Sequence, residues 1–231
     1  YFASIPKFAA MNFFTQIGIL LRKELVLELR MGYAISGILL YVLSTVFIVY
    51  AAFFQGVNSP MLWVTLFWII MLFASVNAIV KSFVQENGAR QLYYYGLLDP
   101  LAVIVSKMIY NISLLFFLSL LTWAALAFIV GNKVEEFSAF LLALFLGSAG
   151  FSILFTFVAA ISSKADNNST LLAILSFPLV IPILMTLIKL SVGATGMLED
   201  TGIGKDIGIL VAIDLVLAGL TLVLYPFLWR D

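Results

Sequence analysis

Asp214 is the ionisable residue best placed for chemistry inside an apolar stretch of this sequence. It lies about two turns into a run of apolar residues that extends approximately from Ile207 to Trp229. An ionised carboxylate there is costly unless it faces water, a polar neighbour or the interior of a helix bundle. We therefore interpret Asp214 as a candidate functional residue. The alternative is that it reaches the membrane interface or pairs with Lys189, near the end of the preceding apolar run.

The absence of histidine and cysteine narrows the possible chemistry further. It removes the usual general base, the commonest axial heme ligand and the preferred zinc ligands. An intramembrane hydrolase is then limited to a Ser-Lys dyad, in which Lys107 or Lys189 would meet a buried Ser. Heme ligation through Met or Tyr stays open as a minor alternative. We predict a non-catalytic chain without a metal site or a bound cofactor of its own.

A nucleotide-binding loop is also missing from the sequence. The closest fragment, Gly204-Lys205-Asp206, lacks the leading glycine and the hydroxyl residue that a G-x-x-x-x-G-K-[ST] loop uses to hold phosphate and magnesium. If this protein works with ATP-Mg, the nucleotide is therefore expected to bind to a separate subunit.

Six apolar segments, each about as long as a bilayer is thick, occupy most of the 231 residues. They run approximately from Tyr33 to Phe54, Met61 to Val80, Leu101 to Val130, Phe137 to Ile161, Ser169 to Ser191 and Ile207 to Trp229. The chain is 64% hydrophobic and 10% charged, and both values exclude an ordinary soluble domain. We predict an all-α polytopic membrane protein with six transmembrane helices in one domain, residues 11–231.

Orientation is predicted from the basic residues, because short loops rich in Lys and Arg stay in the cytoplasm. With both termini inside, most basic residues fall at the cytoplasmic face, and only Lys133, Lys189 and Lys205 fall at or near the outer face. The formal net charge is zero, which gives no reason to expect a nucleic-acid partner.

The segment before the first span predicts an amphipathic helix at residues 11–30. Phe14, Ile17, Leu21, Leu25 and Leu29 recur at intervals of three or four residues. Such a helix would lie at the surface of the lipid bilayer, and it could also border a cytoplasmic partner. Residues 1–10 are interpreted as an upstream extension or an expression remnant.

The connection at residues 81–100 is too long for a simple turn. Glu86 and Arg90 stand four residues apart, in the order that favours an ion pair on a helix. Asp99 is expected to cap the third span, with Pro100 in its first turn. The segment is either an interfacial loop anchored by Tyr93, Tyr94 and Tyr95 or a docking element for a cytosolic partner.

Two features of the later spans concern helix shape and packing. Pro178 and Pro182 each remove a backbone donor, so the fifth span should be kinked or broken, as a static kink or as a hinge. Small residues cluster at Gly147, Ser148, Ala149, Gly150 and Ser152. They predict close helix packing, either within one chain or between two copies in a homodimer.

Three groups of residues make the sequence resemble the heme exporter protein B family from about Met11 to the C-terminus. They are Leu21-Arg-Lys-Glu-Leu25, the pattern Glu86-Asn-Gly88 with Leu97-Leu-Asp-Pro100 and Lys107-Met108, and Ser176-Phe-Pro-Leu-Val-Ile-Pro-Ile-Leu184. Compared with typical members, this chain is richer in Phe and Tyr.

The resemblance implies a permease with the ABC-2-type exporter architecture, located in the bacterial plasma membrane. It further implies a cytosolic ABC ATPase subunit, a heme-handling membrane subunit and a periplasmic heme chaperone as partners in cytochrome c maturation. Heme would be a possible cargo of the complex. The docking segment implied for the ATPase comprises Gln85, Glu86, Gly88, Arg90, Leu97, Asp99 and Pro100. From the position of Asp214 inside the sixth apolar run, we expect Asp214→Asn to leave folding intact and to impair transport-linked activity.

Two other functional classes remain open from the sequence. One is an ABC-2-type exporter permease for an unrelated amphiphile, which would share the six spans and the cytoplasmic helix. The other is a membrane-embedded hydrolase that uses the Ser-Lys dyad.

Overall fold

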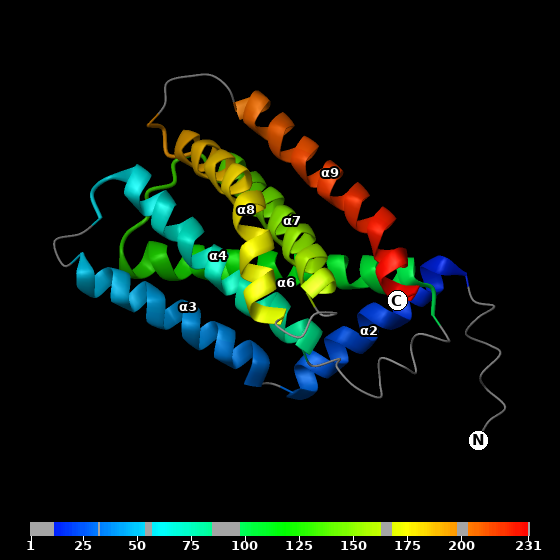
Figure 1. Cartoon of the computed structure of the whole chain (residues 1–231). Helices are drawn as coiled ribbons and strands as arrows, with labels where there is room; N and C mark the ends of the chain where they lie inside the picture. Colours follow the sequence, from blue (N-terminus) through cyan, green and yellow to red (C-terminus); the bar gives the residue numbers. More distant parts are fainter. Residues whose placement is uncertain are drawn as a thin grey trace.

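Seven helices account for nearly all of the residues that the computed structural model describes (Figure 1), namely 12–31, 33–53, 57–84, 98–162, 168–197 and 203–230. They are α2 (Phe13–Met31), α3 (Tyr33–Ala52), α4 (Pro60–Val84), α6 (Pro100–Ile129), α7 (Phe137–Ser162), α8 (Asn168–Gly193) and α9 (Ile203–Arg230). These described ranges contain no β-strand. The all-α prediction is therefore confirmed for them.

Five of the helices are long and apolar enough to cross a membrane, and they correspond to the second to sixth predicted spans. They are α4, α6, α7, α8 and α9. The first predicted span is the helix α3, whose apolar part from Ser36 to Ala52 is shorter than the other five. Its helical structure is confirmed, while its crossing of the membrane stays a prediction.

Helix α7 lies at the centre of the bundle. It packs against α4, α6, α8 and α9, and every residue from Phe151 to Ala160 is buried. Two hydrogen bonds join α7 to α6: the Ser152 hydroxyl donates to the Met108 carbonyl at 3.1 Å, and the Asn111 amide donates to the Thr156 hydroxyl at 2.9 Å. In lipid, where the hydrophobic effect does not drive helices together, close packing and such bonds hold a bundle.

The small residues of α7 are packing positions inside the chain. Gly147 lies against the ring of Trp68 from α4, so closely that an added Cβ would overlap it. The Trp68 indole then donates to the Ser191 hydroxyl of α8 at 2.9 Å. Gly147 therefore lets three helices meet at one point, as its predicted packing role requires.

The two prolines of α8 do not break it. The helix runs continuously from Asn168 to Gly193 through Pro178 and Pro182, and both prolines are exposed. Of the two expected shapes, kinked or broken, the broken one is therefore wrong, and the kink stays a prediction. Each proline removes only its own N–H, so the hydrogen bonds of the neighbouring turns can keep the helix continuous. The hinge role stays a prediction.

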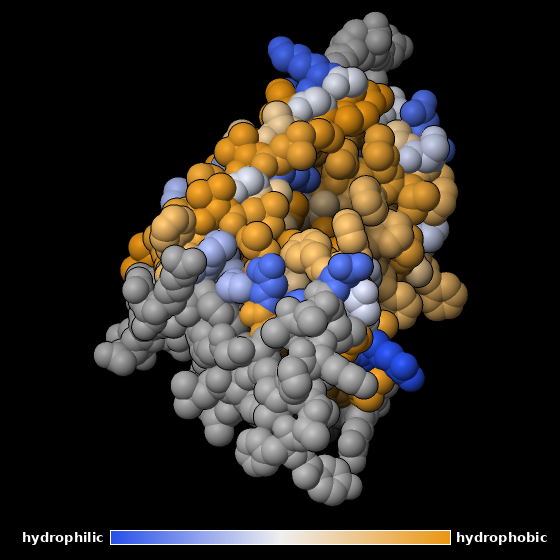
Figure 2. Space-filling model, turned by 90° about the vertical axis from the view of Figure 1, so that its right-hand side faces the viewer, coloured by the Kyte–Doolittle hydropathy of each residue, from blue (hydrophilic) through white to orange (hydrophobic). Residues whose placement is uncertain are grey.

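The described part of the bundle surface is largely apolar on the face drawn in Figure 2. There, hydrophobic residues cover most of the coloured area, and hydrophilic residues lie near its upper and lower limits. Large apolar side chains of α8 and α9, including Phe177, Met185, Leu215, Val223 and Phe227, are exposed. Solvent-exposed apolar area on this scale is typical of a lipid-facing surface.

Candidate functional site

The junction between α2 and α6 positions the first group of candidate residues. The Asp99 carboxylate accepts a hydrogen bond from the Leu101 backbone at 2.9 Å, and Pro100 begins α6. The predicted helix cap is therefore confirmed. The backbone N–H of Asp99 also donates to the Gln16 side chain of α2 at 3.2 Å. One residue thus starts α6 and ties it to the N-terminal helix.

Helix α2 buries one side against α6 and leaves another side exposed. Ile17 and Leu20 pack on Ala102 and Val103, whereas Phe14 is 83% exposed. The predicted apolar face of α2 therefore has two parts: α6 covers Ile17, whereas Phe14 stays exposed. The exposed part is suited to contact with lipid at the membrane surface.

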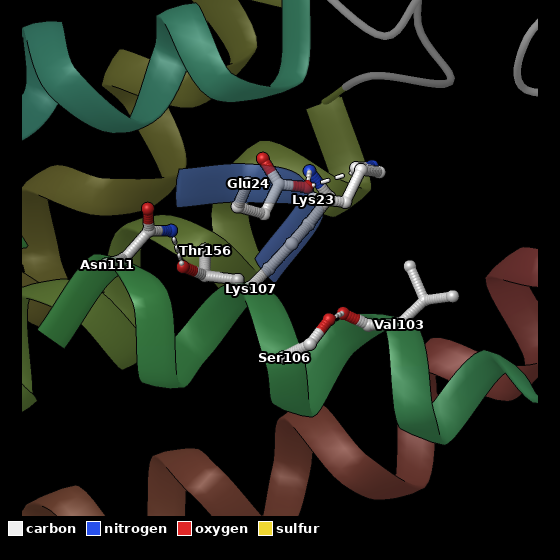
Figure 3. Close-up of polar contacts among 7 residues, drawn as sticks. All are labelled: Lys23, Glu24, Val103, Ser106, Lys107, Asn111 and Thr156. Atoms are coloured by element: carbon white, nitrogen blue, oxygen red, sulfur yellow. Dashed lines mark hydrogen bonds and ion pairs between the residues drawn. The ribbon is translucent and has the colours of Figure 1, made fainter. Parts of the chain in front are cut away.

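An ion pair also joins α2 to α6, about two turns further along the chain than Asp99. Lys107 is only 2% exposed, and its ammonium lies 3.8 Å from the Glu24 carboxylate of α2. The same carboxylate lies 3.0 Å from the Lys23 ammonium. Figure 3 shows Glu24 and Lys23 on α2 and Lys107 reaching them from α6. A charge as deeply buried as Lys107 needs such compensation.

The geometry around Lys107 does not favour a Ser-Lys dyad. The adjacent Ser106 hydroxyl donates to the Val103 carbonyl of its own helix at 2.8 Å, and Figure 3 shows it pointing away from the Lys107 side chain. Lys107 instead holds two helices together.

The polar row on α6 continues toward the core. Asn111, one turn after Lys107, is fully buried and bonds Thr156 of α7. Lys107 therefore contacts α2 and Asn111 contacts α7, from neighbouring positions of one helix (Figure 3). Neighbouring positions of α6 thus link α2 to the central helix α7.

Asp214 is the second candidate, and it lies inside the bundle. It is 8% exposed, and its carboxylate lies against Gly150 of α7. Lys189 does not pair with it; the Lys189 ammonium is 3.9 Å from Asp206, which lies about two turns closer to the start of α9. The alternative of a Lys189–Asp214 pair is therefore wrong.

Most of the predicted docking segment lies outside the described residues. This applies to Gln85, Glu86, Gly88, Arg90 and Leu97, and residues 1–10 are likewise outside. Asp99 and Pro100 are described, and they place the end of the segment beside α2. Docking itself stays a prediction.

Only a weak signal for the Glu24–Lys107 pair is present in the sequence. Lys107 is a lone cation within a long apolar run, and Glu24 belongs to the short charged group in α2. Within the described ranges, no three acidic, His or Cys residues come together as metal ligands.

The comparison with protein families covers nearly the entire chain. The family model described as CcmB protein matches residues 15–229, a range that includes both candidate sites and nearly all of the residues in the seven described helices. No curated protein matches the chain. The chain therefore belongs to the CcmB family, the heme exporter protein B family of membrane permease components for cytochrome c maturation.

Proposed function

We propose that this chain is the permease subunit of an ABC-type complex of cytochrome c maturation, and that a separate cytosolic subunit hydrolyses ATP for it. It would cross the bacterial plasma membrane six times with both termini inside, in the ABC-2-type arrangement. A heme-handling membrane subunit and a periplasmic heme chaperone would complete the complex. The work done by ATP would be heme export or release of the heme-loaded chaperone.

The observation that carries this proposal is the family match over residues 15–229, and the junction of α2 with α6 supports its coupling to a separate ATPase. Its two polar links, Gln16 with Asp99 and Glu24 with Lys107, lie eight residues apart on each helix. The apolar contacts of Ile17 and Leu20 lie between them. A helix held at two points and packed between them would move together with α6.

The position of this junction suits coupling to an ATPase. The predicted docking segment ends with Asp99 and Pro100, and the Asp99 backbone is hydrogen-bonded to Gln16 of α2. A subunit bound to that segment would therefore act at the place where α2 and α6 are joined. The hydrogen bonds of Asn111 and Ser152 would carry the motion into α7.

Genetic complementation tests the proposed pathway. In a bacterial strain that lacks its own heme exporter protein B, we expect this chain to restore covalent heme on periplasmic c-type cytochromes, measured by heme staining of denaturing gels. The partner subunits from the same source should be expressed with it. An empty vector with the same partners is the control.

Two outcomes would contradict the proposal. Normal c-type cytochromes without this chain would show that it is dispensable for maturation. Failure to restore them, with the chain and its partners present in the membrane, would favour export of an unrelated amphiphile.

A further inference from the structure

The surroundings of Asp214 are unusually tight for a carboxyl group. A Cβ added to Gly150 of α7 would lie 2.7 Å from the Asp214 Oδ1 atom and 3.4 Å from Ile183 of α8. The carboxyl group therefore lies directly on the α7 backbone, beside an apolar side chain of α8. A side chain at position 150 would take up the space that Asp214 occupies.

The described residues offer this carboxyl group no polar partner. Neither of its oxygens accepts a hydrogen bond from any of them, and both are buried. Helices α6, α7 and α8 pack against α9. Helix α7 carries no titratable residue at all.

The charged and titratable groups on the other packed helices are engaged elsewhere or lie in water. On α8 the sole titratable residue is Lys189, which is 71% exposed and pairs with Asp206. On α6 they are Lys107, which faces Glu24, and Tyr110, which does not hydrogen-bond Asp214. On α9 itself, Lys205 and Asp206 lie about two turns or more away, and Tyr225 lies about three turns away.

Three states of the group can be compared on physical grounds. A bare carboxylate is strongly disfavoured in an apolar interior without donors. A bound metal cation needs several oxygen ligands, and the described residues bring no cluster of acidic side chains to this place. A carboxylic acid carries no charge and fits against Gly150 and Ile183.

We propose that Asp214 is a proton-binding site that is occupied while α9 packs against α7 and α8. When these helices separate and water enters, the O–H bond of the acid breaks and the proton passes to a water molecule, leaving the carboxylate. Repacking requires the carboxylate to take a proton back from water. Proton uptake and helix packing are therefore linked, whatever the cargo of the protein is.

Infrared spectroscopy of the full chain in lipid nanodiscs tests this inference. At neutral pH, the wild type should show the carbonyl stretching band of a protonated carboxylic acid, at the high-frequency end expected without hydrogen bonds. Asp214→Asn should remove this band. Asp206→Asn, a change on the same helix at a residue paired with Lys189, should leave it in place.

The titration of the wild type provides a second measurement that needs no variant. Deprotonation places a charge in the packed interface, so both the band and the thermal stability should fall as the pH is raised. Asp214→Asn should keep its stability over the same range if it folds. Absence of the band from the wild type at neutral pH, or its persistence in Asp214→Asn, would overturn the proposal.

Discussion

Replacing Glu24 with alanine is expected to lower the free energy of unfolding of the bundle by about 3–5 kcal/mol. The reason is that Lys107 is 2% exposed and lies 3.8 Å from Glu24. Without this carboxylate, the buried ammonium loses the opposite charge that Glu24 supplies, while its burial keeps it away from water. Unfolding in mild detergent, followed by circular dichroism or by differential scanning fluorimetry, measures the effect.

A double-mutant cycle separates the ion pair from other effects of the Glu24 substitution. Methionine at position 107 keeps most of the length of the lysine chain and removes its charge, so Glu24→Ala with Lys107→Met should recover much of the lost stability. Glu136→Ala, a change of an exposed carboxylate at the start of α7, should alter stability by no more than about 0.5 kcal/mol. A double variant as unstable as Glu24→Ala would show that the pair does not hold α2.

The second large effect is expected for Gly147→Val. Its Cβ would overlap the Trp68 ring, which is fully buried. To relieve the overlap, Trp68 must move and give up its hydrogen bond to Ser191. Overpacking of a core costs about 1–3 kcal/mol, and the lost bond adds to this. Tryptophan fluorescence and thermal unfolding should both report the change.

Gly208→Val is the matched control for this substitution. Gly208 also lies in a long helix, α9, but nothing lies within 4 Å of the place where its Cβ would be. The two changes alter intrinsic helix propensity alike. We therefore expect Gly208→Val to unfold at nearly the temperature of the wild type. Equal effects at both positions would contradict the packing role of Gly147.

The helices of this protein could be predicted because each is marked locally. Long apolar runs identified the spans. Asp99 followed by Pro100 predicted the start of α6, and the structure has Asp99 as the cap of that helix. The period of three to four residues identified α2, although it did not reveal which part of the apolar face α6 would cover. That division depends on tertiary packing.

The ionic contacts could not be predicted with the same success. Glu24 and Lys107 are far apart in the sequence, and nothing in either segment specifies the other. Two acidic residues of α9, Asp206 and Asp214, are both possible partners of Lys189 by sequence position. The structure pairs it with Asp206 near the helix start, where water is accessible, and leaves Asp214 inside. Rotation of α9 about its axis decides this, and its apolar sequence does not fix that rotation.

Affinity purification of the tagged chain in mild detergent, with its native partners expressed, tests the proposed permease role most directly. We expect an active ATPase and a heme-handling membrane subunit to copurify. Glu86→Arg, in the predicted docking segment, should remove the ATPase activity. Glu136→Arg should retain it, because Glu136 follows the far end of α6, a helix of 30 residues that is about 45 Å long. An intact, membrane-inserted chain that recovers no ATPase would contradict the proposed function.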